Sequence, residues 1–151
     1  MNRREFITLL GGAAAWPIAA HAQQGDRVRR IGVLMLDEND RGGRLRYTAL
    51  TQALAGLGWP DGRNVRMDLR WGGSDINRIR AHAHELVGLQ PDIIVTNGVP
   101  TTAAVQRETR TIPIVFVAVG DPLASGIVAR LDRPSGNVTG CGALEATLGA
   151  R

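Results

Sequence analysis

The chain has 151 residues, which is enough for one domain with a hydrophobic core. Hydrophobic residues make up 44% and charged residues 21%, a composition that is ordinary for a globular protein and argues against intrinsic disorder. All 18 basic residues are arginines and the formal net charge is +4, but the arginines are scattered along the chain, so we expect a solvated surface and no nucleic-acid partner.

The first 22 residues have the pattern of an export signal. Arg3 and Arg4 precede an apolar segment from Ile7 to Ala20, and Ala20-His21-Ala22 fits an A-x-A cleavage site. The apolar segment is short for a membrane span, although an uncleaved membrane anchor remains an alternative. We therefore expect cleavage after Ala22 by the export machinery and a mature protein in the periplasm.

The run Arg3-Arg4-Glu5-Phe6-Ile7 resembles the twin-arginine export motif. Asn2 before the arginines and Thr8 after the run depart from the fuller motif. Both twin-arginine export and the general secretory route therefore stay open.

The first strand and helix follow a polar linker at residues 23–29. Ile31 to Leu36 is continuously apolar, which predicts a strand buried on both faces. The next eight residues form a polar loop in which Gly42-Gly43 indicates a turn. A helical stripe that ends at Gly58 follows, with Leu50, Ala53, Leu54 and Leu57 on one face.

Residues 64–71 alternate strictly between polar and apolar side chains. The apolar positions are Val65, Met67, Leu69 and Trp71, and the polar ones are Asn64, Arg66, Asp68 and Arg70. Period two predicts a strand with one buried and one wet face, which suits an edge of the sheet. An amphipathic helix over residues 76–87 should follow, capped by Ser74 or Asp75.

The remaining elements continue the alternation of strands and helices. We predict strands at Ile93 to Thr96 and at Ile112 to Ala118, with a helix between them that begins near Pro100. Asp121-Pro122 predicts the cap and first turn of another helix that runs to about Leu131. One more short strand is expected at residues 138–140.

This order predicts an α/β fold, a doubly wound parallel sheet with strand order 2-1-3-4. Ligands of such sheets bind beyond the carboxyl ends of the strands, where the strand order reverses. Three predicted loops converge there, at residues 37–41, 96–102 and 120–122.

Several chemistries do not fit that site. Asn97 stands where a receiver domain has its phosphate-accepting aspartate, and without lysine no P-loop is possible. Ser74, Ser125 and Ser135 are not in a G-x-S-x-G setting, so a serine hydrolase is not indicated. The spacing of the histidines does not suit a metal, and Cys141 is the single cysteine. We expect no cofactor, no metal and no enzyme.

The loop after the third predicted strand suits the capture of a small molecule. Thr96, Asn97, Thr101 and Thr102 offer hydroxyl and amide groups, and backbone N–H groups from Val99 onward lie at a helix N-terminus that favours a carboxylate. The alternative is that the threonines only cap and satisfy the helix start. The residues alone favour neither reading.

Four segments resemble one transport family. They are RREFITLLGGAAAWP in the leader, LAGLGWPDGRNV, TRTIPIVFVAVGDPLASGIVARL and RPSGNVTG. Together they resemble the extracytoplasmic substrate-binding components of ABC transporters, which have the periplasmic-binding-protein type I fold. The resemblance spans essentially the whole chain, and the stretch from Ile112 to Gly140 is its most specific part.

The resemblance implies a solute, often an amino acid and commonly an aromatic one, trapped between two α/β lobes and delivered to a membrane permease. Carried over, the contacts of the first lobe would be Asp37, Glu38, Asn39, Thr96, Asn97, Gly98, Thr101, Thr102, Gly120 and Asp121. Relatives often have Ser, Gly or Ala where this chain has the acidic residues Asp37 and Glu38, which argues against an anionic ligand there.

Relatives are also about twice as long. The resemblance implies a signal peptide at 1–22, a linker at 23–29, an amino-terminal lobe at 30–140 and a truncated start of the crossover at 141–151. The expectation is a fragment of a solute-binding protein. The alternatives are a stand-alone exported domain that binds a protein partner, or a non-functional truncated gene product.

Overall fold

The computed structural model describes residues 27–132 and 136–142. The expected leader, most of the expected linker and residues 143–151 lie outside the described residues. In the described part of the chain, no helix has the length and apolar character needed to cross a membrane.

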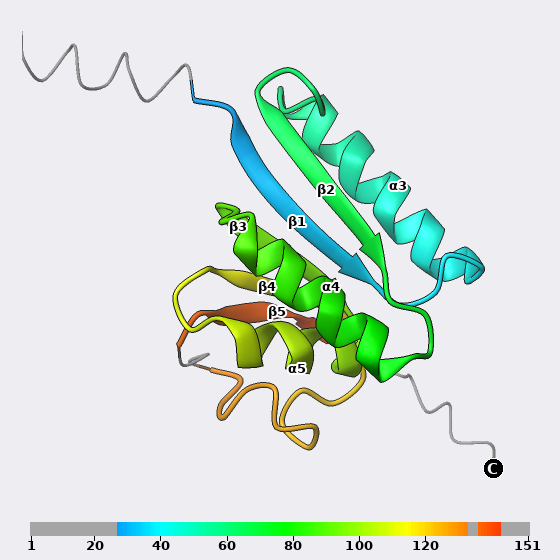
Figure 1. Ribbon diagram of the computed structural model, residues 1–151, viewed down its shortest axis with the longest axis vertical. Coiled ribbons are helices and arrows are strands. Elements are labelled where there is room, and N and C mark those ends of the chain that lie inside the picture. Colours follow the sequence, from blue (N-terminus) through cyan, green and yellow to red (C-terminus); the bar gives the residue numbers. More distant parts are fainter. Residues whose placement is uncertain (1–26, 133–135, 143–151) are drawn as a thin grey trace, which may run out of the picture.

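Five parallel strands form one sheet in the order β2-β1-β3-β4-β5 (Figure 1). Their bounds are Arg29–Met35 (β1), Val65–Trp71 (β2), Ile93–Asn97 (β3), Ile114–Val119 (β4) and Val138–Gly142 (β5). The predicted order 2-1-3-4 is confirmed, and the short strand expected at residues 138–140 is β5, paired with β4. The order reverses between β1 and β3, because β1 pairs with β2 on one side and with β3 on the other.

Helices lie on both faces of the sheet. Figure 1 shows α4 (Ile76–Gly88) and α5 (Val99–Glu108) side by side in front of the sheet, and α3 (Arg41–Gly56) alongside β1 and β2. Right-handed crossovers place α3 on the face opposite to α4 and α5, because the chain moves outward from β1 to β2 and then back past β1 to β3.

The hydrophobic core lies between the sheet and the pair α4 and α5. Side chains of alternate strand positions supply the sheet side, and one face of each helix supplies the other. The largest fully buried members are Leu34, Leu86, Ile94, Val105, Ile114 and Val119. Each fully buried Leu, Ile or Val contributes roughly 1.5–3 kcal/mol to folding, so this layer holds the strand ends in place.

The start of α3 differs from the prediction. Gly42 and Gly43 belong to its first turn and do not form a separate turn, because the Asp40 carboxylate accepts hydrogen bonds from both of their N–H groups. At the other end the helix stops where predicted, with Gly58 at φ +90°. Leu57, expected on the buried stripe, is 76% exposed.

Strand β2 lies at the sheet edge as predicted, but its polar face is not exposed to solvent at every position. Asp68, expected on the wet face, is 8% exposed. It lies between two arginines: its Oδ2 is 3.2 Å from Nε of Arg30, and its Oδ1 is 3.5 Å from Nε of Arg66. The pairing with β1 therefore buries a charge that the alternating pattern assigned to solvent.

The prediction of a helix from Pro122 to Leu131 is wrong. The Asp121 carboxylate accepts from the N–H groups of Leu123 and Ala124, so a helical first turn begins as predicted. The chain then enters the left-handed region at Gly126, with φ +71°, and only turns and bends follow through residue 132. Ile127 and Val128 are buried against the core instead.

Candidate functional site

The carboxyl ends of β1, β3 and β4 bring the three predicted loops to one edge of the sheet, here called the carboxyl edge. Gly98, which follows β3, donates its N–H to the carbonyl of Val117 in β4 at 3.0 Å. It also lies against Leu36, which follows β1. The loops after β1 and β3 and strand β4 are therefore in direct contact at the point where the strand order reverses.

Gly98 has a backbone that other residues do not adopt. Its φ is +89° and its ψ is 171°, a region essentially confined to glycine. A Cβ atom there would lie 2.8 Å from Leu36 Cδ1. The residue is the N-cap of α5 without any side-chain cap, and the first free N–H of the helix is that of Val99, because Pro100 has none.

The three threonines of this loop are turned inward. Thr96, Thr101 and Thr102 are all 0% exposed. The Thr101 hydroxyl donates to the carbonyl of Asn97 at 2.7 Å, the Thr102 hydroxyl donates to the carbonyl of Gly98 at 2.6 Å, and the Thr96 and Thr102 hydroxyls lie 2.8 Å apart. Their polar groups thus satisfy one another and the turn into α5, and they hold this turn from inside.

Asn97 is placed differently from its neighbours. It is 4% exposed, and its side-chain amide makes no hydrogen bond within the described residues. Strand alternation puts Asn97 on the α3 face together with Val95, whereas Thr96 points to α5. Its amide atoms are not among the fully buried polar atoms without a partner, so they reach the surface with their hydrogen-bonding capacity unused.

A hollow of about 290 Å³ lies on the α3 face of the sheet, and its lining includes Val95, two residues before Asn97 on the same strand. Met35, Val95 and Val117 form its sheet side, and Tyr47 and Leu50 of α3 stand opposite. Burial raises the pKa of the Tyr47 phenol, and the negative charge of Asp61 raises it further. Sequence reasoning missed this hollow, because periodicity marked Met35 and Leu50 only as core residues.

The loop after β1 is exposed and acidic. Asp37, Glu38 and Asn39 are all solvent-exposed. The Asp37 carboxylate accepts a hydrogen bond from the Asn39 N–H at 2.9 Å, which closes the turn that leads into α3. Glu38 is left at the tip of the loop.

The loop after β4 contains a feature that the sequence did not indicate. Ala118 has φ +54°, in the left-handed region, and the pairing of β4 with β5 shifts register between Val117 and Val119. Gly120 and Asp121 follow and are both exposed. Because the Asp121 carboxylate caps the next turn, its free surface is smaller than the sequence suggested.

Within the described residues, no group of three or more His, Cys, Asp or Glu side chains could hold a metal ion. Cys141 lies exposed on β5. What the described part of the carboxyl edge offers is a set of hydrogen-bonding groups, several exposed carboxylates and an apolar hollow.

Comparison with known proteins gives a family match over most of the chain. Residues 31–147 match the family model described as ABC transporter substrate binding protein. A curated relative, a tyrosine-binding protein of Clostridioides difficile, is 34% identical over 89 residues, which are 59% of this chain and 26% of the relative.

Two solved structures are similar in fold and sequence. A conserved domain protein from Vibrio cholerae matches with a TM-score of 0.76 and 30% identity, covering 80% of this chain and 40% of that one. The ABC domain in complex with L-Trp from Streptococcus pneumoniae matches with a TM-score of 0.71 and 27% identity, covering 76% of this chain and 38% of that one. The chain thus spans less than half the length of each of these proteins.

Proposed function

Because this chain belongs to the ABC transporter substrate-binding protein family, we propose that its carboxyl edge forms one wall of a cleft that captures an amino acid. The observation that carries the proposal is Asn97, a residue with an unbonded side-chain amide at the reversal of strand order, on the same face of β3 as an apolar hollow lined by Val95. The relatives named for binding tyrosine and L-Trp favour an aromatic side chain.

The three parts of an aromatic amino acid match three parts of this edge. Its carboxylate suits the Asn97 amide and the Val99 N–H at the start of α5. Its ammonium group suits the exposed carboxylates of Asp37 and Glu38, which would repel a purely anionic solute. Its ring suits the apolar hollow beside Met35.

The predicted contact residues then divide into two roles. Direct contacts to the solute are proposed for Asp37, Glu38, Asn39, Asn97, Gly98, Gly120 and Asp121. Thr96, Thr101 and Thr102 are fully buried and bonded to one another and to the turn, so we assign them the role of fixing the Asn97–Val99 turn.

The rest of the proposal concerns the whole protein. The facing wall would come from a second lobe outside these 151 residues, as the greater length of the relatives suggests. The protein would be exported through its leader to the periplasm, bind its solute without chemical change, and deliver it to a permease in the inner membrane.

Titration of the ¹⁵N-labelled chain with L-tyrosine and L-tryptophan, followed by NMR, tests the proposal. A single wall should bind weakly, with dissociation constants of roughly millimolar, and the shifted amides should be those of residues 37–39, 97–99 and 120–121. Asn97→Ala should abolish the shifts, whereas Thr48→Val on the exposed part of α3 should keep them. Shifts that spare the carboxyl edge, or that are equal for L-glutamate, would contradict the proposed site and solute.

A further inference from the structure

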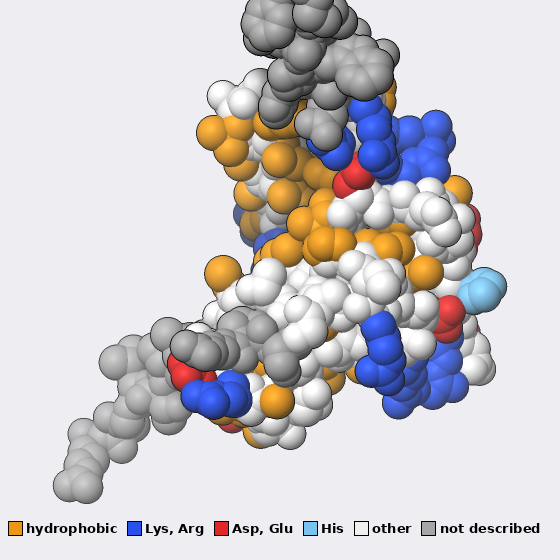
Figure 2. All heavy atoms as spheres, turned by 90° about the vertical axis from the view of Figure 1, so that its left-hand side faces the viewer, with side chains coloured by type: hydrophobic (Ala, Val, Ile, Leu, Met, Phe, Trp, Pro, Cys, Tyr) orange, Lys and Arg blue, Asp and Glu red, His pale blue; other side chains and the backbone are white. Residues whose placement is uncertain are grey.

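The opposite edge of the sheet, at the amino ends of the strands, is rich in arginine. Five exposed arginines lie there, before β1 and β2, at the start of β2, at the end of α5 and in the segment before β4: Arg27, Arg63, Arg66, Arg107 and Arg110. We call these five residues the basic edge. Figure 2 looks onto this side of the molecule and shows blue basic side chains beside orange apolar ones near the point where the chain enters the fold.

The acidic groups nearby do not cancel these charges. Asp92 accepts hydrogen bonds from Arg27 at 3.1 Å, Arg29 at 3.4 Å and the N–H of Arg30 at 2.9 Å. Asp68 pairs with Arg30 and Arg66, and Glu108 lies 2.9 Å from His84. The fourth carboxylate, that of Asp61, accepts a hydrogen bond from the Met67 N–H. The five arginines of the basic edge together with Arg29 and Arg30 carry seven positive charges against these four carboxylates, which leaves a surplus of three.

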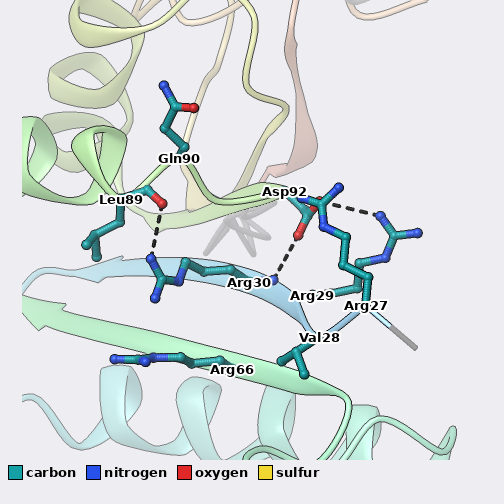
Figure 3. A pocket seen from close by; sticks show the side chains of 8 residues that line it. All are labelled: Arg27, Val28, Arg29, Arg30, Arg66, Leu89, Gln90 and Asp92. Carbon is teal, nitrogen blue, oxygen red and sulfur yellow. Dashed lines mark hydrogen bonds and ion pairs between the residues drawn. The ribbon is translucent and has the colours of Figure 1, made fainter. Parts of the chain in front are cut away.

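The arginines spread over a surface and do not converge on one point. A pocket of about 360 Å³ lies among them, and Figure 3 shows its lining. In that pocket Arg27 and Arg29 gather around Asp92 on one side, whereas the Arg30 side chain extends away from them and donates to the carbonyl of Leu89 at 3.1 Å. A small anion would need convergent guanidinium groups, so this arrangement suits an extended anionic surface better.

Apolar side chains are exposed beside the basic edge. Val28 is 52% exposed, and Leu57 and Trp59 at the end of α3 are 76% and 41% exposed. Tryptophan and arginine together are typical of groups that lie at a membrane interface, where the indole ring is half in water and arginine binds phosphate. Arg27 is also the first described residue, so the chain enters the fold at this edge.

From the surplus charge, the spread of the arginines and the exposed Trp59, we propose that the basic edge docks on a bilayer of anionic phospholipids. The arginines contact the headgroup phosphates, and Trp59 and Leu57 enter the interface. In this orientation the carboxyl edge faces away from the bilayer, into solution.

Flotation of the full 151-residue chain with lipid vesicles tests this docking. Vesicles of phosphatidylcholine and phosphatidylglycerol in a ratio of roughly 70:30 are compared with vesicles of phosphatidylcholine alone. Each arginine at an anionic surface strengthens binding roughly fivefold, so R27Q/R63Q/R66Q should lower the partition coefficient for the anionic vesicles by about a hundredfold. These substitutions leave Asp92 paired with Arg29 and Asp68 paired with Arg30, so the fold should persist.

The matched control is R41Q/R44Q/R78Q, which removes three exposed arginines from the starts of α3 and α4 at the other end of the molecule. It should change the partition coefficient less than about threefold. In a W16F/W71F background, Trp59 fluorescence should shift to shorter wavelength with the anionic vesicles, and Trp59→Ser should weaken binding in the otherwise native chain.

Four outcomes would overturn the proposal. Equal loss in both triple variants would show a general charge effect, and equal binding to both vesicle types would show that the leader alone partitions. Binding to soluble polyglutamate in preference to vesicles would indicate an acidic protein partner instead. If R27Q/R63Q/R66Q fails to fold, the same measurement is made on R107Q/R110Q and on Trp59→Ser. An unchanged partition coefficient for the anionic vesicles in both of these variants would also overturn the docking.

Discussion

The Thr96 hydroxyl donates its proton to the Thr102 hydroxyl, 2.8 Å away, inside the turn that carries Asn97. The direction follows from the neighbouring bond. Thr102 has one O–H and donates it to the carbonyl of Gly98 at 2.6 Å, so towards Thr96 it can act only as the acceptor. The two threonines thus form a short chain of hydrogen bonds from β3 through α5 to the backbone of Gly98.

This direction predicts unequal costs for removing the two hydroxyls. Thr96→Val deletes the donor and leaves Thr102 with its bond to Gly98, so it should lower the free energy of unfolding by about 1 kcal/mol. Thr102→Val leaves the Thr96 hydroxyl buried without a partner and should cost about 2–3 kcal/mol. Urea denaturation measures both, and the double variant should cost less than the sum of the two. Equal costs would contradict the assigned direction.

Gly98→Ala tests the backbone at the carboxyl edge. Alanine does not adopt φ +89° with ψ 171° without strain, and its Cβ would contact Leu36. We expect a loss of about 2–3 kcal/mol in the free energy of unfolding. Gly88→Ala is a suitable control, because no side chain lies within 4 Å of the position that its Cβ would occupy and its φ is not positive. Adding Leu36→Ala should relieve the contact with Leu36 but leave the backbone strain.

Asp92 should make stability depend on pH in the acid range. The hydrogen bond from the Arg30 N–H, together with the charges of Arg27 and Arg29, holds the pKa of Asp92 below its ordinary value of 3.8. Because the folded-state pKa is the lower one, this contribution is fully present above the ordinary pKa and is lost as the pH falls through the folded-state pKa.

The stability difference between wild type and Asp92→Asn should therefore be greater at pH 7 than in acid and should shrink as the pH falls below about 4. Thermal melts across the pH range measure it. In R27Q/R29Q the backbone bond of Arg30 remains, so the pH at which stability is lost should rise towards the ordinary value without reaching it. A difference that stays constant between about pH 7 and pH 2 would contradict this account.

The two arginines that pair with Asp68 should differ in importance. The Arg30 side chain is 29% exposed and also donates to the carbonyl of Leu89, whereas the Arg66 side chain is 64% exposed. Arg30→Met should cost about 2–3 kcal/mol of stability, because it leaves a buried carboxylate with one solvated partner. Arg66→Met should cost less than about 1 kcal/mol. Chemical denaturation of both variants checks the order, and a larger effect for Arg66 would contradict it.

The strands could be predicted from the sequence because most of them show a local pattern, an apolar run in β1, β3 and β4 and an alternation in β2. The strand predicted at Ile93 to Thr96, observed as Ile93–Asn97, and the edge position of β2 follow from the hydrophobic pattern and from the rule on crossovers. The cap of α4 was also local, since Asp75 accepts from the Asn77 N–H two residues on. These strands and this cap depend on residues that are close together in the sequence, so they can be predicted from one sequence.

The features that were missed depend on contacts that are distant in the sequence, or on competition between local signals. Asp68 is buried because Arg30 of β1 lies beside it, which no pattern within β2 reveals. At residues 121–126, Asp121 and Pro122 favoured a helix, but Gly126 ended it after one turn. At the candidate site, the sequence left two roles open for the threonines, and their burial favours the structural one.

The pairing of β1 also bears on how the chain reaches this structure. The N–H of Arg30 bonds to Asp92, 62 positions later, and β1 pairs with β3 along the same interface. Among the strand pairings of the sheet, that of β1 with β3 therefore joins the segments that lie farthest apart in the sequence. Chains dominated by such distant contacts fold slowly, and while β3 is still missing, one side of β1 presents unpaired backbone. While a ribosome has released residues 29–71 but not yet 93–97, the β3 side of β1 has no partner strand, and this apolar segment is a natural place for a chaperone to act.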